Sequence, residues 1–337
     1  HPGGKREAGS ARGERPARPG RLWLFRAIVL ALPFALLGLL EGGLRLAGYG
    51  RNLEPLFIAA PGHPDYRQAN PRAVLRFFAD PAQAPSVSIE TAYFKAMKPP
   101  QSFRVVVQGE STTAGFPYGL GASLAGMLEQ RLKRSYPDRE IEVIQTAMAA
   151  VNSYALLDFA DEIIAQQPNA VLIYVGHNEY LGILGVGSTL RFASAPWITR
   201  AVLAVREWRM FQLMQQFMGG LMKAAPDRSP AADDSLMARV AGERSIALDS
   251  PLFERGVAQF EHNLDALLAR YKARGIEVYI GTLASNERDL PPFAGEAARA
   301  MFQHARALET DGHFQRARDS YLRAKDLDEL RFRAPEV

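Results

Sequence analysis

Short apolar runs alternate with amphipathic stretches between residues 102 and 290, and this alternation limits the possible folds more than any other feature of the chain. Strand-like runs occupy 104–108, 140–145, 170–176 and 276–285, and helix-like segments occupy 123–137, 153–168 and 253–275. Apolar runs without polar alternation are typical of parallel strands that are buried on both faces. The pattern therefore predicts an α/β fold in which helices cover both faces of a parallel sheet.

Composition excludes several classes of protein. The chain has 337 residues and is 47% hydrophobic, enough for one large domain or two modest ones. It contains no cysteine, which excludes disulfides, thiolate nucleophiles and cysteine zinc sites. The net charge is +4, but the basic excess lies within the first 26 residues and the remainder is nearly balanced. We therefore expect no nucleic acid among its partners.

The N-terminal region carries a membrane signal. A basic leader (1–21) precedes a predicted transmembrane anchor (22–48), in which Leu22–Leu40 contains a single charge, Arg26. That length can span a bilayer. The positive-inside rule keeps the leader in the cytoplasm and places the rest on the periplasmic side of the inner membrane. A cleaved signal peptide or an amphipathic helix is the alternative.

Two further segments are predicted around the α/β domain. Residues 49–101 are rich in proline and weakly periodic, which predicts a linker or an extended lead-in. Within the domain (102–290), residues 181–250 are predicted to be an inserted segment that is rich in Met and aromatic residues over 206–222. This segment is interpreted as a lid over the substrate, or else as a core-packed or membrane-facing helix followed by a loop.

The tripeptide Gly109-Glu110-Ser111 directly follows the first strand-like run. In parallel sheets, ligands bind at the carboxyl ends of the strands, where backbone N–H groups of the next helix can stabilise an oxyanion. The G-x-S-x-G elbow is absent because position 113 is Thr, and the lysine of a P-loop is also absent. Taken alone, the tripeptide is better interpreted as a turn that carries no chemistry.

A second motif, "GHNEY" (Gly176–Tyr180), ends the third strand-like run and brings Asn178 to the same edge of the sheet. A serine nucleophile and an amide donor together fit acyl transfer. A strand followed by G-x-S and a later strand followed by G-x-N resemble the SGNH (GDSL-type) hydrolase superfamily. The resemblance is closest to bacterial membrane-anchored members that contain a tetratricopeptide (TPR) insertion, with Glu110 where many members have Asp.

The resemblance implies a flavodoxin-like three-layer α/β/α fold and a membrane-anchored serine esterase or acyl-transfer enzyme. Ser111 falls on the nucleophile and Asn178 on the oxyanion donor. Ala149 or Ala150 falls where the family has a glycine whose N–H completes the oxyanion hole. Further residues that could line the site are Glu110, Thr112, His177 and Glu179. The implied substrate is an ester-bearing lipid, polysaccharide or small molecule, and no metal or cofactor is implied.

The base that would activate Ser111 is not apparent in the chain. The family draws Asp and His from a D-x-x-H motif near the end of its domain, and this sequence has no such motif. His262 falls within a helix-like segment, and His304 and His313 fall within a different pattern. We therefore expect the chain to be truncated before the D-x-x-H block and to lack most hydrolytic activity, because an unassisted serine is a weak nucleophile.

That other pattern lies within residues 295–330 and fits one TPR unit. Small residues at Ala305, Ala317 and Ala324 allow two antiparallel helices to approach closely. A single helix pair cannot bury its apolar face alone, so a protein partner is one expectation. An ordinary helical hairpin is the alternative. The competing functional hypothesis is a catalytically inactive SGNH/TPR scaffold that mediates protein interactions at the cell envelope.

Overall fold

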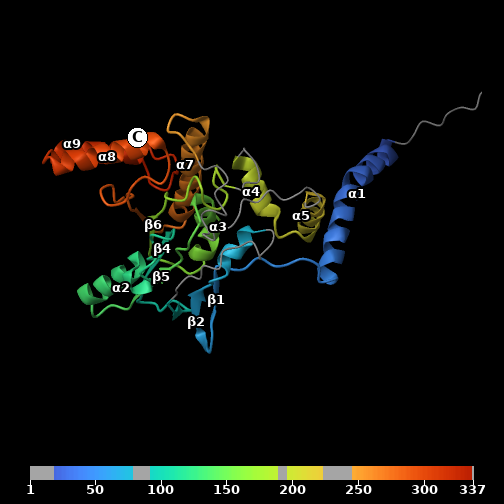
Figure 1. The fold of residues 1–337 in the computed structure, drawn as a ribbon. Coiled ribbons are helices and arrows are strands. Elements are labelled where there is room, and N and C mark those ends of the chain that lie inside the picture. Colours follow the sequence, from blue (N-terminus) through green and yellow to red (C-terminus); the bar gives the residue numbers. More distant parts are fainter. Residues whose placement is uncertain (1–18, 79–91, 189–195, 223–244, 336–337) are drawn as a thin grey trace, which may run out of the picture. The chain divides into compact units, whose positions relative to one another are not determined.

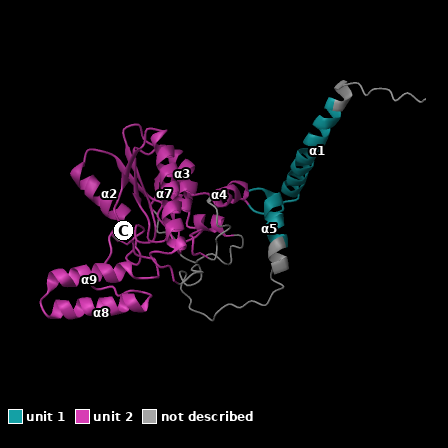
Figure 2. Cartoon of the chain, turned by 90° about the horizontal axis from the view of Figure 1, so that it is seen from above, with its two compact units in different colours: residues 1–51, 207–224 teal, residues 52–206, 225–337 magenta. Residues whose placement is uncertain are grey.

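The computed structural model describes residues 19–78, 92–188, 196–222 and 245–335 (Figure 1). The chain divides into two compact units (Figure 2). One comprises residues 1–51 and 207–224, and the other comprises residues 52–206 and 225–337. Most of the predicted leader and parts of the predicted insertion (181–250) lie outside the described residues.

The larger unit contains a parallel sheet, which confirms the prediction from the apolar runs. Its strands are β4 (Phe103–Gly109), β5 (Ile141–Gln145), β6 (Ala170–Tyr174) and β7 (Glu277–Ile280). Their order is β5-β4-β6-β7, and every neighbouring pair is parallel. Val106 and Val171 in the two central strands are completely buried. Strands enclosed in this way need no polar alternation.

Helices cover both faces of this sheet. After the 3-10 turn η3 (Leu120–Ala122), α2 (Leu124–Ser135) packs on the face that carries Val105 and Val107. The opposite face, which carries Val106, packs against α3 (Ser153–Ile164) and α7 (Pro251–Lys272). The structure therefore has the arrangement expected from alternating strands and helices.

Each of these helices begins at a capping side chain. Ser123 accepts a hydrogen bond from the N–H of Gly126 and caps α2, and Ser250 caps α7 in the same way. Asn152 caps α3 by accepting from the N–H of Tyr154. Gly275 follows α7 with a φ of 66°, a left-handed conformation that suits glycine.

The region predicted to be a linker (49–101) instead contains ordered structure. A small antiparallel sheet comprises β1 (Phe57–Ala60), β2 (His63–Ala69) and β3 (Phe94–Lys95), and η1 (Ala73–Phe77) follows β2. Leu56 and Phe77 are buried in the same core as α3. Non-periodic aromatic and aliphatic residues make this contact, so the sequence pattern did not reveal it.

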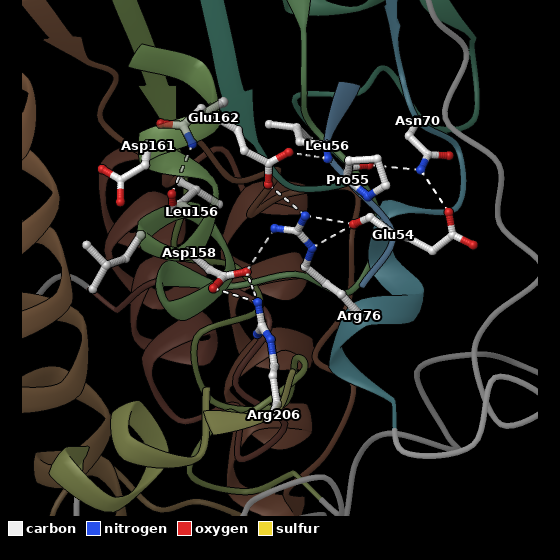
Figure 3. Close-up of polar contacts among 12 residues, drawn as sticks. Glu54, Pro55, Leu56, Asn70, Arg76, Leu156, Asp158, Asp161, Glu162 and Arg206 are labelled. Atoms are coloured by element: carbon white, nitrogen blue, oxygen red, sulfur yellow. Dashed lines mark hydrogen bonds and ion pairs between the residues drawn. The ribbon is translucent and has the colours of Figure 1, made fainter. Parts of the chain in front are cut away.

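Buried ion pairs also hold this region to α3 (Figure 3). Arg76 donates to Glu162 at 2.6 Å and to Asp158 at 3.2 Å, and it also binds the carbonyl oxygen of Glu54. Glu162 accepts a further hydrogen bond from the N–H of Leu56. With its charge paired and most of its donors used, Arg76 is buried without an uncompensated charge.

The smaller unit comprises α1 (Pro19–Leu46) and α5 (Arg209–Met222) (Figure 2). Within α1, Trp23–Leu46 is long and apolar enough to cross a membrane, with a mean hydropathy of 2.2, and none of the residues in its most apolar stretch is buried. The predicted insertion is therefore divided between the units, because α4 (Pro196–Val205) belongs to the larger one.

Residues 295–330 form a helix pair, α8 (Glu296–Thr310) and α9 (Phe314–Asp326). The pair has its own apolar cluster, in which Phe302 packs against Tyr321 with ring centroids 5.3 Å apart. Ala305, Ala317 and Ala324 are buried in that cluster, which is the role expected of small residues there. The assignment of this pair to the TPR class stays a prediction.

Candidate active site

The two sequence motifs meet at one edge of the parallel sheet. Strands β4 and β6 are neighbours in register, with Gly109 paired to Tyr174. The residues that follow these strands therefore emerge side by side at the carboxyl edge, where sheets of this kind bind ligands. Ser111 is partly exposed at this edge, whereas Glu110 is buried.

Glu110 ties the two motifs together. One carboxylate oxygen accepts hydrogen bonds from the N–H groups of Gly176 (3.2 Å) and Asn178 (3.0 Å), and the other accepts from the N–H of His177 (2.9 Å). Burial raises the pKa of Glu110 to about 8, although the three N–H donors act to lower it. Because Glu110 is only 1% exposed, we assign it a positioning role: it fixes the Gly-His-Asn loop against the turn that carries Ser111.

Gly109 and Thr113 make this close approach possible. A Cβ atom at Gly109 would lie 2.1 Å from Oγ1 of Thr113 and 2.4 Å from the carbonyl oxygen of Tyr174. The buried Thr113 hydroxyl donates to that same carbonyl at 2.8 Å. No side chain can therefore occupy position 109. Sequence reasoning used Thr113 only to exclude the G-x-S-x-G elbow and missed this contact.

The side chain of Asn178 has a hydrogen-bond donor without a partner among the described residues. Its backbone is held on both sides, because its N–H donates to Glu110 and its carbonyl oxygen accepts from the N–H of Gly182 at 2.6 Å. The residue is 3% exposed, and Nδ2 of its amide is buried without a hydrogen-bond partner among the described residues. An unpaired buried donor is costly for folding. It is also what an oxyanion hole requires before the reaction begins.

The turn predicted to supply backbone N–H groups lies beside Asn178. A Cβ atom at Gly182 would lie 2.5 Å from the carbonyl oxygen of Asn178 and 2.8 Å from that of Ala150, so the two carbonyls are close together. Ala150 has a φ of 64°, in the left-handed region that favours glycine. Whether Ala149 or Ala150 donates to an oxyanion stays a prediction.

His177 has a defined tautomer. Its Nδ1 lies 2.9 Å from the carbonyl oxygen of Phe332, which accepts a hydrogen bond, so the proton resides on Nδ1 and the lone pair on Nε2. Nε2 is buried without a partner in the described part of the chain, and burial lowers the pKa of the imidazole. The ring packs against Tyr174 with centroids 6.0 Å apart. His177 is therefore held as a neutral imidazole.

Among the described residues, the hydroxyl of Ser111 has no hydrogen-bond partner. In particular, no histidine there accepts its proton in a hydrogen bond. Thr112, next in the chain, is exposed. The site therefore combines a serine hydroxyl, an unpaired amide donor and a fixed loop at one edge of the sheet, and none of the described residues contacts the serine as a base.

Glu179 is buried and connects the Gly-His-Asn loop to α3 and α7. Oε1 accepts from the Ser153 hydroxyl (2.8 Å) and from Nε2 of Gln259 (2.6 Å), and Oε2 accepts from the N–H of Ser153 (3.1 Å). Burial raises the pKa of Glu179 to about 7. Asn263 donates to the same hydroxyl at 3.0 Å, so α3 and α7 are joined through this carboxylate. These partners lie far apart in the sequence, and pattern reasoning did not find them.

Asn152 is a second residue that sequence reasoning missed. It is completely buried and caps α3 through its amide oxygen, while its Nδ2 has no hydrogen-bond partner in the ranges that the structure describes. Sequence reasoning began this helix at Ser153 and did not identify Asn152 as its cap. Within those ranges, no group of three or more His, Asp or Glu side chains could hold a metal ion.

A scan against protein-family models and a search of curated proteins found no match. Solved structures gave matches. TesA is 14% identical over 66% of this chain and 70% of its own, with a TM-score of 0.29. The psychrotrophic esterase EstA from Pseudoalteromonas sp. is 14% identical over 64% and 73%, also with a TM-score of 0.29. AlinE4, an SGNH-hydrolase family esterase, is 13% identical over 64% and 97%, with a TM-score of 0.25. At such scores, the chemistry has to be inferred from the site itself.

Proposed function

We propose that this chain is a serine-dependent ester hydrolase or acyl-transfer enzyme. The observation that carries the proposal is the buried, unpartnered amide of Asn178, which Glu110 holds beside the turn of Ser111. A stable fold rarely leaves such a donor unpaired without a use for it. A negatively charged tetrahedral intermediate on Ser111 would accept a hydrogen bond from it.

The proposed reaction proceeds in two stages. Ser111 Oγ attacks the ester carbonyl carbon, its proton passes to a base, and the carbonyl oxygen becomes an oxyanion held by Asn178 Nδ2 and backbone N–H groups. The oxyanion then re-forms the carbonyl, and the leaving alcohol departs with the proton from the base. Water or an acceptor alcohol releases the acyl group from Ser111. We place the Asp and His of the base outside the described residues, as the family resemblance implies.

The proposal extends to location and partners. The apolar stretch of α1 and the basic leader support a single-pass anchor in the inner membrane, with the α/β unit on the periplasmic side. The implied substrate is an ester-bearing lipid, polysaccharide or small molecule. The α8–α9 pair supports a TPR-like surface for a protein partner, because Phe314 on α9 is 69% exposed.

The test is hydrolysis of p-nitrophenyl acetate by the product of the complete reading frame that contains these residues. We expect turnover that Ser111→Ala abolishes and that Ser135→Ala preserves, because Ser135 is an exposed serine at the end of α2. Equal rates for the parent protein and Ser111→Ala would contradict the proposal. Absence of turnover in all three proteins would favour the inactive scaffold.

A further inference from the structure

Helix α5 is bonded to the carboxyl-terminal end of α1 through polar groups (Figure 2). Glu41 accepts from the N–H of Met210 at 3.0 Å, and Arg45 donates to the carbonyl oxygen of Glu207 at 3.3 Å. Tyr49, just beyond α1, donates its hydroxyl to Gln216 at 2.6 Å. These contacts join two segments that lie about 160 residues apart in the chain.

The contact lies where α1 would leave the hydrocarbon. The apolar run Leu22–Leu40 has nineteen residues, which at 1.5 Å per residue is about 28 Å, close to the thickness of a bilayer core. Glu41 is the first charged residue after that run, and Arg45 pairs with it at 2.7 Å. The hydrogen bonds that join α1 and Tyr49 to the α5 segment therefore begin at the level of the lipid headgroups or beyond it.

The polar face of α5 is the face that binds protein. Gln212 accepts from the N–H of Arg51 at 2.9 Å, and Arg209 donates to the carbonyl oxygen of Arg51. With Gln216, these residues stand at positions i, i+3 and i+7 of the helix, which lie on one face. The polar side of α5 is thus occupied by hydrogen bonds to the end of α1 and to the residues after it.

Most of an apolar stripe on α5 is exposed, and its first residue, Met210, is half-buried. Met210, Leu213, Met214 and Phe217 stand at i, i+3, i+4 and i+7. Leu213 is 38% exposed, Met214 48% and Phe217 68%. A helix on the surface of a water-soluble domain shows the opposite arrangement, with its apolar stripe inward. An apolar stripe that points away from the protein needs an apolar environment outside it.

Lipid supplies that environment better than a protein partner does, because the stripe is continuous with the level at which α1 leaves the bilayer. Trp208, which is 49% exposed, directly precedes α5. Tyr49 donates a hydrogen bond to Gln216 within α5. Amphipathic aromatics of this kind collect at membrane interfaces. The sequence of α5 carries one charge, that of Arg209, so little opposes burial of its apolar side in lipid.

We propose that α5 is an interfacial helix that lies along the membrane surface beside the end of α1, with Met210, Leu213, Met214 and Phe217 in the acyl-chain boundary. The chain then contacts the bilayer through two segments, one that crosses it and one that lies on it. This inference rests on the proposed anchoring by α1, and it is independent of any ester chemistry.

These 337 residues contain no cysteine, so a single introduced cysteine is unique among them and can be labelled at a chosen position. Single cysteines replace Phe217, Phe314 or Leu30 in the complete protein, are labelled with the fluorophore NBD, and are reconstituted into phosphatidylcholine–phosphatidylglycerol liposomes. Quenching is measured with nitroxides on the lipid acyl chains and with aqueous iodide. Phe314 in α9 is the matched control, because it is 69% exposed and Phe217 is 68% exposed. Leu30 in the middle of α1 reports whether the anchor has inserted.

We expect lipid nitroxide to quench the Phe217 label roughly threefold more than the Phe314 label, and iodide to show the reverse order. Strong lipid quenching at Leu30 with none at Phe217 would overturn the inference and leave the anchor intact. If the lipid nitroxide quenched neither the Leu30 label nor the Phe217 label, the anchor itself would be refuted. A Phe217 label protected from both quenchers would mean that protein covers this face, which also contradicts the proposal.

Discussion

The α/β unit pairs the half-buried carboxylates beside the small sheet and the buried carboxylates of the candidate site in two different ways. Beside the small sheet, Asp158 accepts from Arg76 and Arg206, and Glu162 also accepts from Arg76 (Figure 3). At the candidate site, the carboxylates accept only from neutral N–H, O–H and amide donors. Arginine pairs suit a cross-link whose charge stays fixed. Neutral donors position the site loop without placing a cation beside Ser111, but the carboxylates then carry the full cost of burial.

The largest effect expected from this difference concerns Glu110. In Glu110→Ala, three buried N–H groups lose their acceptor, and we expect the free energy of unfolding to fall on the order of 4 kcal/mol. Glu110→Gln keeps the shape and one acceptor oxygen, so it should lose less. Urea unfolding measures both variants. If both unfolded at the urea concentration that unfolds the parent protein, the role assigned to Glu110 would be refuted.

The arginine cluster provides the contrasting variant. Arg76→Met leaves Glu162 without its arginine, and we expect a loss of about 3 kcal/mol in the free energy of unfolding. Asp158 keeps Arg206, which limits the damage. Ester turnover of the folded fraction should be unchanged, because this cluster does not touch the site. A large fall in turnover at unchanged stability would break the distinction between the two regions.

Glu179 in the candidate site should make the stability of the protein depend on pH. Burial raises the pKa of Glu179 to about 7 from a value of 4.5, so the folded protein holds that proton more tightly than the unfolded chain does. The resulting stabilisation is complete below the lower pKa and is lost as the pH rises through the higher one. Between about pH 5 and pH 8, we expect the free energy of unfolding to fall on the order of 2 kcal/mol from this residue.

Thermal unfolding of Glu179→Gln over the same range tests that expectation. The amide cannot ionise, so the variant should show a flatter stability profile than the parent protein. Glu110 titrates in the same direction, so some pH dependence should remain. A variant with a profile as steep as that of the parent protein would exclude Glu179 as a source.

The smallest expected effect concerns the left-handed backbone of Ala150. Ala150→Gly relieves a conformation that costs a non-glycine residue about 1 kcal/mol, partly offset by the greater freedom of glycine in the unfolded chain. We expect a gain of up to about 1 kcal/mol in the free energy of unfolding. Ala147→Gly is the control, because Ala147 is buried and has no positive φ, and it should be destabilised. Equal losses in the two variants would contradict the strain assigned to Ala150.

The sequence predicted the parts of the fold that depend on local pattern. The four strands of the parallel sheet follow from short, mostly apolar runs, and the position of Ser111 and Asn178 at one edge of the sheet follows from their places after two of those strands. The role of Glu110 could not be predicted in this way, because its partners lie about 66 residues away. The small sheet of β1, β2 and β3 could not be predicted either, because its buried residues follow no period.

The pairing of α5 with α1 was also beyond pattern reasoning. The sequence left the insertion open between a lid, a core-packed helix and a membrane-facing helix. Only the hydrogen bonds of Arg209, Gln212 and Gln216 to residues just after α1 show which side of α5 faces protein. Long-range polar contacts of this kind leave no periodic trace in either segment.

The central claim is that the unpartnered amide of Asn178 stabilises an oxyanion formed on Ser111, and the most direct test is the turnover of Asn178→Ala with p-nitrophenyl acetate. We predict that kcat falls about 100- to 1,000-fold while KM changes little, because the donor acts in the transition state. The variant should unfold at or above the temperature of the parent protein, since the unpaired donor is gone. A folded Asn178→Ala protein that retained the parent kcat would contradict the account.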